Sequence, residues 1–380
     1  MGLTEGRGPA LWTNPAQIIR DMAPDQPVMA FAPAVLRAQA RRFIQGFPGL
    51  VTYAVKANPD KRVIRTLAGA GIGGFDVASP AEIDLIGRLA PGAARHYHNP
   101  VRSRSEIAHA VAAGVRVWSV DSFSELEKLF DALPKGSEIA PRFKLPIKGA
   151  AYDFGSKFGA TPQVAAELLR SVAARGHIPS LSFHPGTQCT DPLPWDGYIR
   201  MAAEIAHMAD TPIHRLNVGG GFPSHRIAGA TPDLESIFRQ IAKSVQVFDR
   251  APQLVCEPGR GLCADAFSLI TRIKAIRNSD IFLNDGVYGG LTELPQIGNL
   301  DRIQVLTPQG LPRDGNVTPR TIFGPTCDSI DRLPGELALP GNVCEGDFVV
   351  FHGAGAYSTV TNTHFNGFGQ LSQVSVKAFS

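Results

Sequence analysis

A lysine closes a run of residues that otherwise has no need of a charge. In the stretch VTYAVK, residues 51–56, five mostly apolar residues stand directly before Lys56. The β-branched and aromatic residues of this run predict a buried β-strand, and a helix is expected after Asn58-Pro59. A partly desolvated lysine at the end of a strand could act as a nucleophile or form a Schiff base. The alternative is a strand-end lysine whose ammonium group reaches solvent.

Polar residues or glycines also close other strand-like runs. They are Asp76 and Ser79 after GGF, Arg142 within EIAPRFKL, His184 with Pro185-Gly186-Thr187 after SLSF, Gly219-Gly220-Gly221 after HRLNV, and Glu257 with Pro258-Gly259-Arg260 after QLVC. Each has a purely structural alternative, such as a hydrogen-bonded core histidine or a tight glycine turn. In a parallel barrel, however, all strands open on one face at their carboxyl ends, so these side chains would meet there.

The glycine run predicts an anion site. Gly219 to Gly221 would expose backbone N–H groups that an anion can approach closely, and Thr187 and Arg260 could add further donors. Barrels of this type often place a phosphate site after the seventh and eighth strands. We therefore expect these residues to hold a phosphate group.

Three further residues predict what carries the phosphate. His184 is flat and could stack on an aromatic ring, and Glu257 could accept a hydrogen bond from a protonated ring nitrogen. Lys56 supplies an amine for a Schiff base with an aldehyde. A ring with a phosphate, a basic nitrogen and an aldehyde is pyridoxal 5′-phosphate (PLP), whose protonated ring withdraws electrons from the substrate.

The elements that would position these residues alternate between strands and helices from about Ala30 to Arg260. The strand-like runs are residues 51–55, 73–79, 96–99, 115–120, 138–145, 180–186, 214–221 and 253–260. Amphipathic helical stretches lie between most of them, at residues 80–90, 103–114, 122–133 and 161–176. Ser103 with Glu106, and Ser122 with Glu125, predict capping boxes at two helix starts.

Eight strands with helices between them predict a (β/α)₈ TIM barrel of the alanine racemase-like type. A doubly wound open sheet is the alternative, but the candidate site residues follow many strands rather than one crevice. After about Asp265, short strands joined by Gly/Pro turns predict an all-β domain. We therefore expect a PLP-binding barrel at residues 28–265 and a β-sheet domain at 266–380 that includes residues 1–27.

Composition excludes several other classes of protein. The chain has 380 residues, a net charge of +3 and 44% apolar residues, with no basic run that would indicate nucleic-acid binding. Its five cysteines form no CxxC pair, so neither a metal site nor a disulfide framework is predicted. The start, MGLTEGRGPALW, does not resemble a signal peptide, and no apolar run approaches the ~18 residues of a membrane span. These features favour a cytoplasmic protein.

The motifs resemble those of the fold-type III PLP enzymes, and within them the ornithine decarboxylase-like group of basic amino-acid decarboxylases. YAVKANP is similar to the Schiff-base lysine motif of that group, and GFDVASPAEI to the strand that follows it. SFHPGTQCTDP is similar to the histidine-stacking motif, with Pro185 in place of valine and Thr187 in place of serine. LNVGGGFP, CEPGRGL, NDGVYGG, FGPTCDSIDRL, and GAGAYS with FNGF resemble the remaining motifs. The resemblance runs from about Val51 to Gly367, with eight motifs in the family's order.

The resemblance implies roles for individual residues. The catalytic residues would be Lys56, Cys327, His184 and Glu257. The cofactor would be held by Lys56, Asp76, Arg142, His184, Thr187, Gly219, Gly220, Gly221, Glu257, Gly259, Arg260 and Tyr357. Substrate would be bound by Asp328, Cys327 and Tyr288. Without the GPTCDS context, Cys327 would be interpreted as an inert buried thiol.

The same resemblance implies a reaction and an assembly. Cys327 would return a proton to the α-carbon after CO₂ leaves, and Asp328 would bind the distal amine of a diamino acid. Both would enter the active site of a neighbouring subunit, which implies a homodimer with two shared sites. The implied reaction converts L-ornithine or L-lysine into putrescine or cadaverine, a step of the kind found in polyamine biosynthesis.

One departure leaves the substrate open. Ornithine decarboxylases carry an aspartate-histidine pair between the NDGVYG and GPTCD motifs, and this pair is missing from GLTELPQIGNLDRI. Glu293 is the acidic residue near that place. A longer, shorter or modified diamino acid, such as an intermediate of siderophore or polyamine biosynthesis, therefore stays an alternative. The diaminopimelate branch usually has glutamate where Asp328 stands.

Two other functions are less well supported by these residues. A racemase of this fold typically has arginine at the pyridine nitrogen, where this chain has Glu257. A non-enzymatic PLP-binding protein would be a bare barrel, and an antizyme inhibitor-like relative would have lost cofactor residues. This chain has the β-domain, and it retains Lys56, His184 and Cys327.

Overall fold

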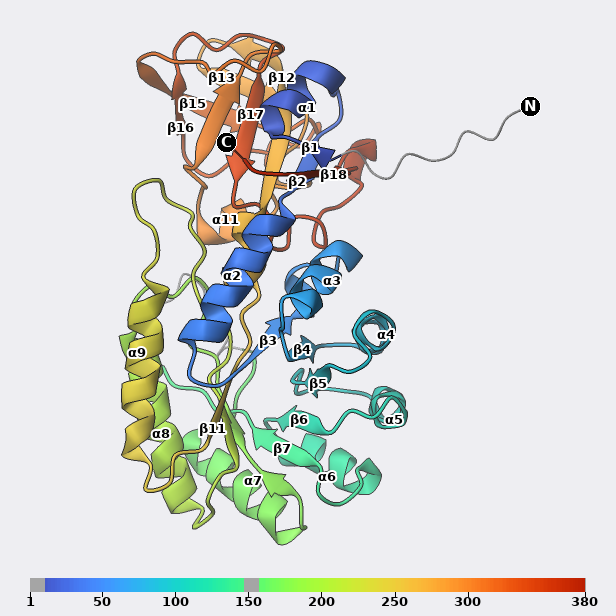
Figure 1. Cartoon of the computed structure of the whole chain (residues 1–380), viewed down its shortest axis with the longest axis vertical. Coiled ribbons are helices and arrows are strands. Elements are labelled where there is room, and N and C mark those ends of the chain that lie inside the picture. The colour runs from blue at the N-terminus through green and yellow to red at the C-terminus, as the bar shows by residue number, and fades with distance from the viewer. Residues whose placement is uncertain (1–10, 147–156, 380) are drawn as a thin grey trace, which may run out of the picture. The chain divides into compact units, whose positions relative to one another are not determined.

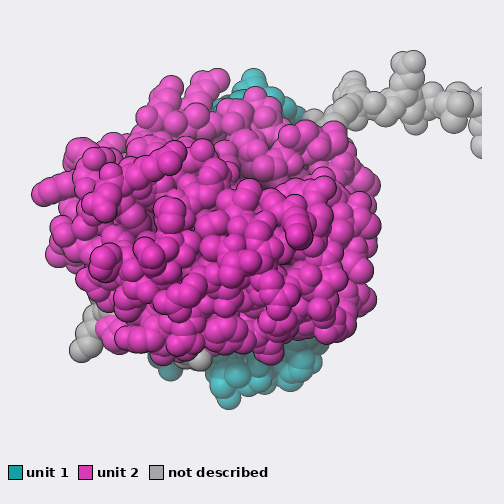
Figure 2. All heavy atoms as spheres, turned by 90° about the horizontal axis from the view of Figure 1, so that it is seen from below, with its two compact units in different colours: residues 1–38, 224–231, 263–380 teal, residues 39–223, 232–262 magenta. Residues whose placement is uncertain are grey.

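The computed structural model describes residues 11–146 and 157–379 (Figure 1). Residues 1–10, which include most of the start that does not resemble a signal peptide, lie outside the described part. The chain divides into two compact units, coloured in Figure 2. The barrel unit contains Gln39–Pro223 and Pro232–Leu262, and the strand-rich unit contains the remainder. The expected barrel start at residue 28 falls at β2 (Val28–Phe31), which pairs with strands of the strand-rich unit.

The barrel unit holds one parallel sheet in the order β8-β7-β6-β5-β4-β3-β11-β10-β9. Its strands are β3 (Leu50–Ala54), β4 (Gly74–Val77), β5 (Ala94–Tyr97), β6 (Val117–Val120), β7 (Glu138–Pro141), β8 (Ile178–Pro179), β9 (Leu181–Ser182), β10 (Arg215–Asn217) and β11 (Gln253–Cys256). Each of the eight predicted strand positions overlaps one of these strands.

The strand at the sixth predicted position is split, and the split nearly closes the barrel. Ser180 separates β8, which pairs with β7, from β9, which pairs with β10. The backbone N–H of Ser180 donates to the carbonyl of Ile139 in β7 at 3.1 Å, and Arg142 forms a parallel bridge with Ser182. One short segment therefore contacts both ends of the sheet, which confirms the predicted (β/α)₈ barrel.

Helices precede or follow the barrel strands and surround them in Figure 1. They are α2 (Pro33–Gly46), α3 (Lys61–Gly69), α4 (Pro80–Leu89), α5 (Arg104–Ala112), α6 (Phe123–Ala132), α7 (Pro162–Ala174), α8 (Leu193–Met208), α9 (Leu234–Ser244) and the short α10 (Arg260–Cys263). Each of α3 to α7 begins at a residue whose side chain accepts a hydrogen bond from a backbone N–H of the first turn.

One of the two predicted capping boxes is complete. Ser103 and Glu106 exchange both bonds at the start of α5. At α6, Ser122 accepts from the backbone of Glu125, but the Glu125 carboxylate instead accepts from Lys128 and from the backbone N–H of Arg102. An ion pair with Lys128 replaces the reciprocal half of that box.

The strand-rich unit is built on the long strand β12 (Phe267–Arg277), which pairs with β2, β13 (Asp280–Leu283) and β17 (Phe348–His352). Its other elements are β1 (Leu11–Trp12), α1 (Pro15–Met22), α11 (Leu294–Ile297), β14 (Ile303–Leu306), β15 (Val317–Phe323), β16 (Leu337–Pro340) and β18 (Ser372–Val376). Ile18, Ile270 and Phe348 belong to its buried apolar core. This confirms the predicted carboxy-terminal domain built mainly of strands.

None of the helices in the described ranges combines the length and the hydropathy that crossing a membrane requires. The five cysteines all lie in these ranges and are free thiols; Cys189, Cys256 and Cys263 are buried, and Cys327 and Cys344 are exposed.

Candidate active site

A cavity of about 340 Å³ opens at the carboxyl ends of the barrel strands. Most of the residues that line it have polar side chains, and they follow or end these strands. The residues are Lys56, Asp76, Ala78, His98, Asn99, Pro100, Ser119, Arg142, Lys157, Phe158, Ser182, Phe183, His184, Asn217 and Glu257. Five residues predicted from the sequence therefore meet in one place: Lys56, Asp76, Arg142, His184 and Glu257.

Lys56 lies one turn beyond the strand that was expected to end on it. The strand β3 ends at Ala54, and Val55–Ala57 form a short 3₁₀ turn. Its neighbours Val55 and Ala57 are buried, whereas Lys56 is exposed and lines the cavity. Lys56 is thus more exposed than a fully desolvated lysine would be, and its amine is placed where a ligand in the cavity could reach it.

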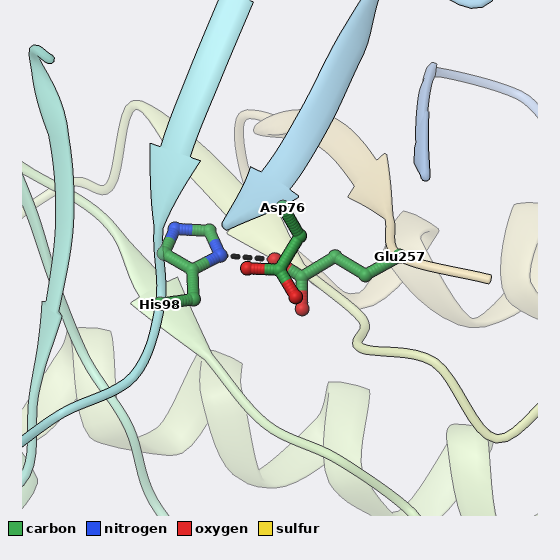
Figure 3. A group of neighbouring side chains, drawn as sticks. All are labelled: Asp76, His98 and Glu257. Carbon is green, nitrogen blue, oxygen red and sulfur yellow. Dashed lines mark hydrogen bonds and ion pairs between the residues drawn. The ribbon is translucent and has the colours of Figure 1, made fainter. Parts of the chain in front are cut away.

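Glu257 is held by two side chains from other strands. It follows β11, and its Oε1 atom contacts Nδ1 of His98, which follows β5 (Figure 3). The same oxygen contacts Nδ2 of Asn217, which ends β10. Burial by itself raises the pKa of Glu257, but the charge and hydrogen bond of His98 and the hydrogen bond of Asn217 lower it to about 2. Glu257 is therefore ionised over the whole physiological pH range.

Neither His98 nor Asn217 was among the site residues predicted from the sequence. His98 lies in the run HYHN and Asn217 precedes the triple glycine, so both are polar residues at the carboxyl end of a strand. Their position at the end of a strand, which they share with the predicted site residues, is the sequence signal that could have identified them.

Asp76, in β4, is protonated at neutral pH, whereas Glu257 is ionised. It is buried, and burial together with the negative charge of Glu257 raises its pKa to about 8. Its Oδ1 atom has no hydrogen-bond partner among the residues that the structure describes. Asp76, His98 and Glu257 each offer one ligand atom within 4.8 Å of the others, so one buried polar group can contact all three.

His184, which follows β9, has the properties of a neutral flat surface. Its Nδ1 atom accepts a hydrogen bond from the backbone N–H of Gly186 at 3.1 Å. Burial and the positive charges of Arg142 and Lys56 lower the pKa of His184 to about 3. The ring is therefore uncharged at neutral pH, which suits stacking on an electron-poor aromatic ring.

The triple glycine is required by close backbone packing. A Cβ atom at Gly219 would lie 2.4 Å from the carbonyl oxygen of Phe183, and one at Gly221 would lie 2.4 Å from that of Gly186. Both glycines have positive φ angles, 71° and 85°. The N–H of Gly219 already donates to Oδ1 of Asn217 at 2.8 Å, so it is engaged in the loop rather than bare as predicted.

The remaining predicted phosphate ligands lie near the ends of β9 and β11. Thr187 is half-buried in the loop after β9, and Arg260 is buried at the start of α10. Gly259 precedes it, where a Cβ atom would lie 2.9 Å from that of Ala57, so this glycine permits the close approach of the turn that carries Lys56.

A second set of predicted residues meets within the strand-rich unit. The hydroxyl of Tyr288 donates to Oδ2 of Asp328 at 2.7 Å. The backbone N–H and the Sγ atom of Cys327 both lie 3.1 Å from Oδ1 of Asn366. Tyr357 belongs to the same unit and has a left-handed backbone with a φ angle of 65°. Tyr288 and Asp328, predicted to bind substrate, are thus direct partners.

Buried Asp331 holds the two loops that carry this pair. Its Oδ1 atom accepts from the backbone N–H of Val287, beside Tyr288, at 2.9 Å. Its Oδ2 atom accepts from the backbone N–H and the hydroxyl of Thr326, beside Cys327, at 3.0 and 2.8 Å. One carboxylate therefore joins the NDGVYGG and FGPTCDS segments.

Glu293 lies directly before α11 and lines a recess of about 10 Å³ together with Arg226 and Ser358. This recess is too small for the side chain of an amino-acid substrate.

The chain is similar to decarboxylases along most of its length. Residues 34–264 match the model of the pyridoxal-binding domain of pyridoxal-dependent decarboxylases. The ornithine decarboxylase of Panagrellus redivivus is 31% identical over 90% of this chain and 84% of that protein. The lysine/ornithine decarboxylase of Selenomonas ruminantium is 30% identical over 84% and 81%. The solved structure of SrLDC in complex with PLP and cadaverine matches with a TM-score of 0.80 and 26% identity, over 94% of this chain and 92% of that one.

The residues of the cavity suit PLP. The ionised Glu257 matches a protonated ring nitrogen, neutral His184 matches a ring face, and the amine of Lys56 matches an aldehyde. The buried Oδ1 atom of Asp76 lacks a partner that a polar ligand could supply. Asp76, His98 and Glu257 could also bind a metal ion. A metal ion, however, would leave the amine of Lys56 and the imidazole of His184 without a role.

Proposed function

Because the chain belongs to the pyridoxal-dependent decarboxylases, whose cofactor is PLP, we propose that it removes CO₂ from a basic L-amino acid. L-Ornithine or L-lysine is the proposed substrate, and putrescine or cadaverine the product. The observation that carries this choice is the Tyr288–Asp328 pair. The hydrogen bond from Tyr288 lowers the pKa of Asp328, so the carboxylate stays ionised and can bind a distal ammonium group.

The barrel residues hold and activate the cofactor in this proposal. Bound PLP supplies an electron sink that stabilises negative charge at the substrate α-carbon. Lys56 would provide the amine that attaches it, and Glu257 would stabilise a proton on its ring nitrogen. His184 would stack on the ring face. Asp76 and Arg142 complete the cavity around it.

The phosphate is assigned to a separate group of residues. Gly219, Gly220 and Gly221 form a loop after β10 in which a Cβ atom at each position would collide with backbone atoms, so only glycines allow its course. An anion would be bound by backbone N–H groups of this loop other than that of Gly219, which donates to Asn217. The donors proposed to join them are Thr187, Gly259, Arg260 and Tyr357.

The chemistry at the α-carbon needs a proton after CO₂ leaves, and we assign it to the thiol of Cys327. This thiol is exposed in the single chain, as is expected of a residue that acts in another subunit. We therefore propose a homodimer in which Cys327 and Asp328 complete the partner's cavity. A cytoplasmic location and a place in polyamine biosynthesis also stay predictions.

A different diamino acid is the second candidate substrate. Glu293, the acidic residue near the place of the missing aspartate, lines a recess too small for a substrate. Asp328 is then the acidic residue proposed to select the distal amine. A longer, shorter or modified diamino acid would need only that single contact.

The test is CO₂ release by the PLP-loaded protein from L-ornithine, L-lysine, L-arginine and meso-diaminopimelate, with the visible absorbance of the bound cofactor recorded in parallel. Release from ornithine or lysine supports the proposal. Cofactor absorbance without release from any of the four would reject the proposed substrates while retaining the cofactor site. If ornithine or lysine is decarboxylated, Asp328→Asn should lower kcat/KM for that diamino acid more than it lowers the affinity for PLP.

A further inference from the structure

The Glu257 carboxylate is contacted by two side chains on the same oxygen. Nδ1 of His98 reaches Oε1 (Figure 3). Nδ2 of Asn217 reaches the same oxygen, and the two nitrogens lie 2.8 Å apart. The side chains of His98 and Glu257 are 8% and 11% exposed, so the pair has little freedom to move. Oε2, the other carboxylate oxygen, carries neither contact.

The hydrogen atoms at this junction can be assigned from chemistry. Oδ1 of Asn217 accepts from the backbone N–H of Gly219, which fixes Nδ2 as the end of the amide that faces Glu257. An ionised carboxylate only accepts hydrogen bonds, so Nδ1 of His98 must carry the hydrogen that lies between it and Oε1. Two N–H groups, one from the residue after β5 and one from the last residue of β10, therefore converge on one oxygen of a residue that follows β11.

We propose that His98 is a positioning residue for the cofactor. Its Nδ1–H group, together with Asn217, holds Glu257 so that Oε2 meets the ring nitrogen of PLP. The strand order places β5 three positions from β11, so His98 reaches Glu257 across the mouth of the barrel rather than from a neighbouring strand. This inference rests on the proposed contact between Glu257 and the ring nitrogen.

The hydrogen bond and the charge of His98 predict opposite effects on the cofactor. A hydrogen bond that positions Glu257 favours the proton on the ring nitrogen. A positive charge on His98 would compete with a protonated ring for the same carboxylate and would disfavour that proton. Substitutions that keep a hydrogen-bond donor at the position of Nδ1 but remove the charge of His98 therefore show which of these two effects governs the ring proton.

The experiment uses holoenzyme loaded with PLP that is ¹⁵N-labelled at the ring nitrogen. The ¹⁵N chemical shift reports the ring proton, and the PLP dissociation constant is measured alongside. His98→Leu removes the donor, and His98→Asn places an uncharged amide near the position of Nδ1. His98→Gln, whose amide reaches one bond further, is the matched polar control if the leucine variant does not fold.

His98→Leu and His98→Gln should lose the ring proton at neutral pH and bind PLP about tenfold or more weakly, as expected when a hydrogen bond to a charged group is lost. His98→Asn should stay close to the parent in both measurements. The inference is overturned if all three variants keep the ring proton, or if the asparagine variant behaves like the leucine variant. Glu257→Gln tests the premise separately, since an unchanged ¹⁵N shift there would reject the role of Glu257 itself.

Discussion

The hydroxyl of Tyr288 donates a 2.7 Å hydrogen bond to the carboxylate of Asp328, and this bond changes both groups. It lowers the pKa of Asp328 and raises the pKa of Tyr288. The carboxylate is therefore both ionised and fixed in direction before a substrate arrives. A fixed anion binds a distal ammonium with less loss of side-chain entropy than a mobile one.

Tyr288→Phe tests this pair. The variant retains the ring but leaves the Asp328 carboxylate with only the hydrogen bond that its Oδ1 atom accepts from the backbone N–H of Ile330. KM for the preferred diamino acid should therefore rise by about fivefold while kcat changes less. Steady-state kinetics measure the change, and PLP affinity serves as the control because Glu257 and Lys56 are untouched. An unchanged KM would show that Tyr288 does not orient the carboxylate for binding.

Asp331→Asn should destabilise the strand-rich unit. In the variant, one carboxylate oxygen becomes an amide NH₂ that faces the N–H of either Val287 or Thr326. A buried donor without an acceptor costs about 1–3 kcal/mol, so the free energy of unfolding should fall by this amount. Urea denaturation measures it. The exposed Asp314→Asn in the same unit is the matched control, with an expected change within about 0.5 kcal/mol; equal losses in the two variants would contradict the role of Asp331.

Lys56→Ala should abolish covalent attachment of PLP. Reduction of the holoenzyme with borohydride fixes the cofactor to its lysine, and mass spectrometry then locates the label. Turnover should fall by about 10³-fold or more, since the attached amine is lost. Lys157→Ala is the matched control, because Lys157 lines the same cavity but lies over the ring of Phe158. A label that survives in Lys56→Ala and disappears in Lys157→Ala would reassign the lysine.

Much of the fold could be predicted from the sequence because its signals are local. β-Branched runs such as Val51–Val55 fix the strands, and Ser103 with Glu106 fixes the start of a helix. Once a parallel barrel is inferred, its geometry places every strand end on one face. For this reason the strand pattern alone predicts that residues as distant in sequence as Lys56 and Glu257 share a cavity.

The contacts of His98 could not be predicted in the same way, because they depend on side-chain reach across the barrel. His98 and Glu257 are 159 positions apart, and their strands are not neighbours in the sheet. Similarly, the local sequence favours a capping box at Ser122 and Glu125. The Glu125 carboxylate instead accepts hydrogen bonds from Lys128 and from the backbone N–H of Arg102. Local patterns identify candidates, and tertiary distances decide which partner each one takes.

The buried imidazole of His96, which lies on β5 shortly before His98, should make stability depend on pH. Burial and the charge of His98 lower the pKa of His96 to about 3. In the unfolded chain this group takes up a proton near its ordinary pKa of about 6.5. Between these two values the unfolded state binds more protons than the folded state, so stability is lost as the pH falls below about 6.5.

His96→Gln isolates this effect. The contribution of one proton is at most about 1.4 kcal/mol per pH unit, and the variant should lose that much of the slope of unfolding free energy between about pH 6 and pH 5. Its slope between about pH 7 and pH 8 should match the parent, because neither state of His96 titrates there. The raised pKa of His98 affects stability in the opposite direction, because its contribution to folding is lost as the pH rises above about 6.5. His98 therefore cannot cause a loss of stability as the pH falls. Urea denaturation across this range measures both slopes, and an equal acid-side slope in parent and variant would show that His96 takes up its proton without unfolding.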